Sequence, residues 1–93
     1  MSRYDENPEQ ADAEIEATQE AARRADDALS DAVARQEAAE SDVDAENAAG
    51  DTAAAQAAAD RVNSIDDEII RFQQEFDEAM DEVGRVARKW GFQ

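Results

Sequence analysis

The sequence predicts an all-α fold: a long antiparallel two-helix hairpin, coiled-coil-like, that packs with further helices in an oligomer or a larger complex. Three observations support this prediction. The 93 residues include only three glycines and one proline, so few positions can interrupt a helix. Apolar residues recur with the alternating three- and four-residue spacing of a coiled coil. The two uninterrupted stretches have nearly equal lengths on either side of Gly50, as a helical hairpin requires.

The first helix is expected to begin at Asn7-Pro8. Asn7 is a suitable N-cap, and Pro8 at the first helical position lacks only an amide hydrogen that would be unpaired there. Glu9 adds a negative charge at the positive end of the helix dipole. No glycine or proline follows before Gly50. The first helix would therefore be about 63 Å long at 1.5 Å per residue.

The turn is expected at Gly50-Asp51. Gly50 adopts a left-handed backbone conformation without strain, and Asp51 and Thr52 then offer side-chain oxygens that cap a second helix. We expect a single turn at residues 49–52 and a chain that is more than about 75% helical, because caps, glycine placement and periodicity agree. The chain is treated as one domain with five consecutive segments: an N-terminal segment 1–7, helix 8–49, turn 50–51, helix 52–90 and C-terminal tip 91–93.

The second helix, about 58 Å long, contains Gly84 and one further candidate irregularity. Ser64 and Asp67 resemble a capping box, so we expect punctuation of the helix, or a kink, at Asn63-Ser64. Its heptad is otherwise unbroken over five repeats, with residues seven apart at position a and the others three positions later at d. Position a holds Ala55, Val62, Ile69, Phe76, Val83 and Trp90, and position d holds Ala58, Ile65, Phe72, Ala79 and Val86.

The first helix repeats this spacing with smaller residues. Its a positions are Ile15, Ala22, Leu29, Gln36 and Val43, and its d positions are Ala11, Thr18, Ala25, Ala32 and Ala39. Folding about the turn places residue i opposite roughly residue 101 − i, so that large side chains mostly meet small ones. The expected pairs are Phe76 with Ala25, Phe72 with Leu29, Ile69 with Ala32, Val62 with Ala39, Ala58 with Val43 and Trp90 with Ala11.

A lone hairpin of this composition has a thin core, because alanine buries little apolar area. Ile70 lies outside the seam, Met80 and Ala87 widen it, and Trp90 and Phe92 gather at the C-terminal tip. This apolar surface exceeds what the alanine-lined first helix covers. We therefore expect protein partners: either a homo-oligomer of three or four packed helices, or a second protein within a large complex.

The last nine residues, 85–93, differ in charge from the rest of the chain. Arg85, Arg88 and Lys89 accompany Trp90 and Phe92, and no acidic residue follows Glu82. One interpretation is that these cations complement the negative end of the helix dipole. The other is a docking tail, in which the cations pair with a neighbour's acids and the aromatic rings fill a pocket.

The net charge is −16, from 25 acidic and nine basic residues, of which one is lysine. Such a chain repels itself at low ionic strength, whereas salt at 1 M shortens the Debye length to about 3 Å. The composition resembles that of proteins from salt-in halophiles, such as haloarchaea or their viruses. The carboxylates are then a solvated surface, and the alternative is a surface that contacts a basic partner.

Several classes of function are disfavoured. Without histidine and cysteine there is no zinc finger, thiol nucleophile or His-based triad. A calcium-loop-like run at Asp42–Asn47 has Asn47 where glycine is expected and Ala53 where the bidentate glutamate is expected. No apolar run approaches the length of a membrane span, and the polar first residues predict no secretory signal. We expect no enzyme activity, cofactor, metal or contact with nucleic acid.

The sequence thus favours a non-enzymatic structural or assembly protein in a high-salt environment, cytoplasmic or within a virion. The most concrete setting is a capsid, neck or tail component of a virus that infects a halophile. The alternatives are a cellular coiled-coil adaptor or assembly chaperone, and an acidic DNA mimic that inhibits a DNA-binding protein. The candidate partner-binding residues are Ile70, Phe72, Phe76, Met80, Val83, Arg85, Arg88, Lys89, Trp90 and Phe92.

Overall fold

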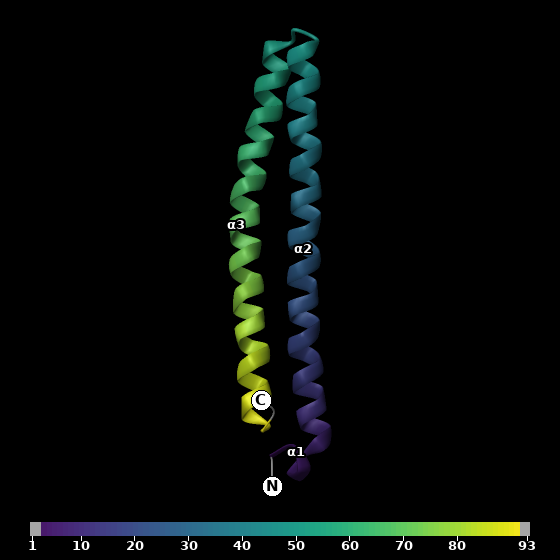
Figure 1. Ribbon diagram of the computed structural model, residues 1–93, viewed down its shortest axis with the longest axis vertical. Coiled ribbons are helices and arrows are strands. Elements are labelled where there is room, and N and C mark those ends of the chain that lie inside the picture. The colour runs from purple at the N-terminus through teal and green to yellow at the C-terminus, as the bar shows by residue number, and fades with distance from the viewer. Residues whose placement is uncertain (1–2, 92–93) are drawn as a thin grey trace.

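The computed structural model describes residues 3–91, with side chains from Asp5 onward, and it is a single antiparallel helical hairpin (Figure 1). A one-turn helix α1 (Arg3–Glu6) precedes the two long helices α2 (Pro8–Ala48) and α3 (Thr52–Lys89). Helix accounts for 93% of the described residues. The start of α2 and the end of α3 lie side by side at one end of the rod. The predicted all-α hairpin with one turn is confirmed.

The hairpin is a rod that is two helices wide. It measures 69 × 15 × 15 Å, and its radius of gyration is 20.3 Å, whereas a compact domain of this length would have about 12 Å. Every residue of such a rod lies close to solvent, so a core can form only along the seam between the helices. Among the described residues, no polar or charged side chain is buried.

The turn is a tight glycine-terminated helix end. Gly50 has a φ of 78°, the left-handed conformation that suits glycine. Its amide donates to the carbonyl of Asn47 at 3.1 Å, and the amide of Asp51 donates to the carbonyl of Glu46 at 3.0 Å, the pair of bonds that defines a Schellman motif. The Asp51 carboxylate then accepts from the amide of Ala54 at 3.0 Å. Asp51 therefore completes one helix end and caps the next helix.

The N-terminal cap of α2 differs from the expectation. Asn7 does occupy the N-cap position before Pro8, but its side chain accepts no capping hydrogen bond. Its backbone has φ −140° and ψ 64°, outside the extended region from which an N-cap side chain reaches the first amides. The carbonyl of Asn7 instead accepts from the amide of Ala11 at 3.0 Å.

The prediction that the second helix is interrupted at Asn63-Ser64 is wrong. Helix α3 runs unbroken through both residues, which are exposed, and through Gly84. On either side of Ser64, Val62 and Ile65 belong to one apolar cluster with residues of α2. Packing along the seam therefore maintains the helix where the local sequence alone suggested a new start.

The predicted seam and register are present. Every expected a and d residue of both helices is buried or half-buried. Near the middle of the rod, Ala32 and Ala39 pack with Ile65, Val62, Ile69 and Phe72. At the open end, Ala11 packs with Val86 and Trp90, and Ile15 covers them. Small residues of α2 thus oppose large residues of α3, as the expected pairing of residues i and 101 − i requires.

Candidate functional site

The side chain of Trp90, at the end of α3, closes the open end of the hairpin. Trp90 is only 4% exposed and packs against Ala11 and Val86. Its indole Nε1 donates a hydrogen bond of 2.7 Å to Oε2 of Glu14 on the opposite helix. Trp90 thus meets Ala11, as the expected pairing predicts, and these contacts lie within one chain.

Glu14 on α2 accepts the hydrogen bonds that join the end of α3 to α2. The Lys89 Nζ donates to both of its carboxylate oxygens, at 2.9 and 3.0 Å, and also lies 5.0 Å from the centre of the Trp90 ring. These hydrogen bonds, from Lys89 first and Trp90 second, lower the pKa of Glu14 below its ordinary value because they stabilise the charged carboxylate. The Glu14 side chain is one-third exposed, so water screens part of this interaction.

The other two basic residues near the end of α3, Arg85 and Arg88, lie against their own helix. Arg85 binds Glu82 one turn away, which raises the pKa of Arg85 and lowers that of Glu82. The Arg88 guanidinium lies over Gly84, 3.2 Å from where a Cβ would stand. Phe92, the remaining candidate at the tip, lies outside the described residues. Trp90, Lys89 and Arg85 are therefore all engaged within the chain.

The two faces of the rod differ. In an antiparallel pair of heptad helices, the g positions of both helices flank the seam on one side and the e positions flank it on the other. The three ion pairs that join α2 to α3 all connect g positions, and we call this side the ion-pair face. They are Glu14 with Lys89 at 2.9 Å, Arg35 with Glu68 at 3.3 Å and Asp42 with Arg61 at 3.7 Å. A hollow of about 380 Å³ on this side is lined by Ala38, Ala39, Ser64 and Ile65 and bordered by the charged residues Arg35, Asp42 and Arg61.

The opposite side, which we call the open face, has two adjoining hollows towards the end closed by Trp90. One, of about 450 Å³, is lined by Gln19, Ala22, Arg23, Asp26, Phe76, Met80 and Val83. The other, of about 250 Å³, is lined by Ile15, Gln19, Val83 and Ala87. Apolar side chains of both helices therefore reach solvent together over about three helical turns. A third hollow nearer the turn, about 420 Å³, is lined by Val43, Val62 and Ala59 together with Glu40, Asp44 and Asn63.

The large apolar side chains that remain exposed also lie on the open face. Ile70 is 55% exposed, Met80 46% and Val33 38%; Met80 and Val33 occupy e positions, and Ile70 lies beside the a position. Ile70 thus lies on the same side of α3 as Met80, nearer the turn than the hollow that Phe76, Met80 and Val83 line. Phe72, by contrast, packs inside the seam. Ion pairs join the two helices on one face of the hairpin. The large apolar side chains that remain exposed lie on the other face.

The sequence reasoning missed the contribution of α2 to this surface. Ile15, Gln19, Ala22 and Asp26 line the hollows, although none of them was a candidate. The available signal was the heptad position: Gln19 and Asp26 are e residues of α2, and an antiparallel register places them beside Met80 and Gln73.

No protein-family model, curated protein or solved structure matches the chain. Within residues 3–91, no group of three or more acidic side chains is arranged to hold a metal ion. None of the described helices is both long and apolar enough to cross a membrane. The functional argument therefore starts from the two faces of the hairpin.

Proposed function

We propose that this chain is a non-enzymatic structural or assembly protein that acts by packing its open face against further helices. The observation that supports this proposal is the pair of adjoining apolar hollows lined by Phe76, Met80, Val83 and Ile15. A coiled-coil seam normally covers its large residues with those of a neighbouring helix. Here α2 offers mostly alanine, so a third helix is needed to cover these side chains.

Burial of this surface is favourable at about 25 cal/mol per Å² of apolar area. Met80 and Ile70 are half-exposed in the hairpin, and both would gain contacts from a helix laid along the open face. The ion-pair face offers less, because its charged side chains already bind one another across the seam. The partner is therefore expected on one side of the rod only.

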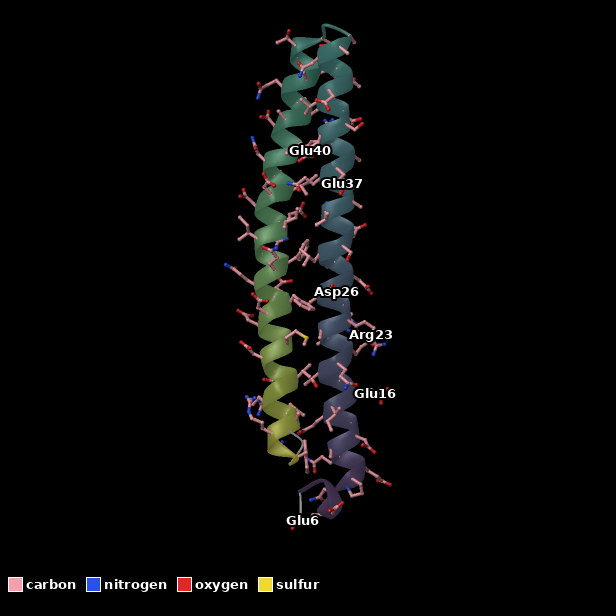
Figure 2. The ribbon with its side chains drawn as sticks, viewed as in Figure 1. Glu6, Glu16, Arg23, Asp26, Glu37 and Glu40 are labelled. Carbon is pink, nitrogen blue, oxygen red and sulfur yellow. The ribbon has the colours of Figure 1, made fainter. Side chains whose placement is uncertain are left out.

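The setting that fits this proposal is a concentrated salt solution. All of the described carboxylates are at least partly exposed, so salt screens their mutual repulsion and water hydrates them. Oxygen-tipped side chains project from both helices along the rod (Figure 2). A virion component of a halophile-infecting virus is the concrete form of the proposal; a cellular adaptor or assembly chaperone uses the same surface.

The experiment compares assembly by matched variants on the two faces. A tagged chain is recovered in about 2 M KCl from the cells that produce it, and the mass and stoichiometry of its complex are measured by native mass spectrometry. Met80→Asp adds a charge to the open face, and Ala17→Asp adds the same charge at an exposed, outward c position of α2 on the ion-pair face.

We expect a complex of defined stoichiometry for the wild type and for Ala17→Asp, and its loss for Met80→Asp at unchanged helicity. A monomeric wild type, or a complex that both variants form equally, would overturn the proposal.

A further inference from the structure

The charges of this chain are distributed unequally between the two faces. On the open face, the e positions and the outward b positions of α2 and α3 hold nine carboxylates and one arginine, a net charge of −8. The acids are Glu9, Asp12, Glu16, Asp26, Glu37, Glu40, Asp44, Asp66 and Asp77, and the base is Arg23. Figure 2 shows Glu16, Arg23, Asp26, Glu37 and Glu40 following one another along α2.

The ion-pair face is close to neutral. Its g positions and outward c positions hold seven carboxylates and six basic residues, a net charge of −1. The acids are Glu14, Asp31, Asp42, Glu68, Glu75, Glu78 and Glu82, and the bases are Arg24, Arg35, Arg61, Arg71, Arg85 and Lys89. A solvated acidic coat needs no such asymmetry, because hydration and screening act equally on both sides of a rod only 15 Å across.

The carboxylates of the open face flank its apolar hollows. Asp26 lines the larger hollow, and Glu16 and Asp77 are exposed on its two sides. Arg23 also lines the larger hollow and lies 3.2 Å from Glu20, which pairs with Arg24 as well. Arg88 extends its guanidinium over Gly84, which occupies a b position of this face. The charges that flank Phe76 and Met80 are therefore mainly acidic.

A second copy of this chain could cover the apolar residues of the open face, but its carboxylates would repel those that flank them. Two open faces brought together would enclose Glu16, Asp26 and Asp77 of one copy with those of the other, and salt screens such enclosed like charges much less than exposed ones, so their repulsion is costly. A helix with lysine or arginine beside its apolar residues satisfies both features, since its cations would lie against Glu16, Asp26 and Asp77. Charge complementarity thus selects a partner of another sequence.

We propose that the open face binds a basic amphipathic helix of another protein, which lies lengthwise along the rod as a third helix. Its apolar residues fill the hollows between Ile15, Ala22, Phe76, Met80 and Val83, and its basic residues face the carboxylates that flank them. This inference rests on the proposed function and identifies the chemistry of the partner. The face sets the orientation of the docked helix, because only the apolar hollows can accept its large side chains.

The test uses three synthetic peptides of about 21 residues, three heptads each, at the lowest KCl concentration at which the hairpin is fully helical, so that charge pairs are screened least. The first has leucine at a and d with lysine and arginine at the flanking positions. The second carries glutamate at those flanking positions, and the third keeps the basic flanks but has serine at a and d. Binding is measured by fluorescence anisotropy of the labelled peptide, and the mass of the hairpin alone is measured by sedimentation equilibrium.

We expect the basic leucine peptide to bind at least about tenfold more tightly than either of the others, since both the apolar residues and the charges are required. Glu16→Gln with Asp26→Asn should weaken its binding about fivefold. The matched pair Glu75→Gln with Glu78→Gln removes the same charge from exposed positions of the ion-pair face and should change it less than about twofold.

Equal binding of the basic and acidic leucine peptides would overturn the inference, as would equal binding of the serine peptide, which would show recognition by charge alone. A hairpin that dimerises more tightly than it binds the basic peptide would make a second copy the occupant. The two proposals fail separately. If Met80→Asp abolishes the complex but the basic peptide does not bind, the assembly function stands and only the basic helical partner is excluded.

Discussion

Substitution of Trp90 by alanine tests whether this residue closes the hairpin. Its side chain is 4% exposed between Ala11 and Val86. A buried tryptophan covers about 200 Å², which at about 25 cal/mol per Å² corresponds to about 5 kcal/mol as an upper bound. Core replacements of tryptophan by alanine cost about 3–5 kcal/mol. Because Trp90 lies at the end of the rod, where the last turns can fray, we expect a loss of about 3 kcal/mol.

The free energy of unfolding is measured in about 2 M KCl by urea titration, with helicity followed by circular dichroism. Trp90→Phe keeps most of the ring but removes the indole N–H that binds Glu14, so its loss should be smaller than that of Trp90→Ala. Ile70→Ala serves as the control, since Ile70 is 55% exposed and should change stability by less than about 0.5 kcal/mol.

Equal stabilities of Trp90→Ala and Ile70→Ala would refute the closure argument. Assembly is measured on the same samples, because a docking anchor at Trp90 would instead weaken association while leaving helicity nearly intact. Loss of stability with normal assembly of the remaining folded chain would exclude the docking tail.

Three further predictions concern salt, pH and the helix caps. Thermal stability should rise steeply between about 0.1 and 2 M KCl as the net charge of −16 is screened; a salt-independent melting temperature by circular dichroism would contradict the halophilic interpretation. The pKa of Glu14 is lowered in the hairpin from its ordinary value of 4.5, so the stability that its carboxylate provides is present above pH 4.5 and is lost as the pH falls through the lowered pKa. The stability difference between wild type and Glu14→Gln should accordingly shrink as the pH falls below 4.5, and a difference that does not change with acidification would count against this assignment. Asp51→Ala should cost about 1 kcal/mol, because the carboxylate caps Ala54, whereas Asn7→Ala should cost clearly less, since the Asn7 side chain makes no capping bond; equal losses in urea titrations would refute the distinction.

The proposed docking surface illustrates how far sequence reasoning reaches. Phe76, Met80 and Val83 were identifiable as candidates because they widen the stripe of one helix. Their partners Gln19, Ala22 and Asp26 were not, because a candidate drawn from the apolar pattern of α3 does not include the polar residues of α2 that border it. Trp90 and Lys89 stood out by composition, but only the position of Glu14 across the seam shows that both are engaged within the chain.

The sequence by itself determined the helices, the turn at Gly50-Asp51 and the register of the seam. These depend on local backbone preferences and on a heptad whose antiparallel register is fixed by the tight turn at Gly50-Asp51. Tertiary structure decided what local signals could not: Ser64 lies inside a continuous helix because Val62 and Ile65 pack against α2, and the Asn7 side chain leaves its cap position unused. It also separated an ion-pair face from an open face. A single helix presents its e and g residues to solvent alike, and only the second helix, through the three ion pairs between g positions, gives the two sides different physical properties.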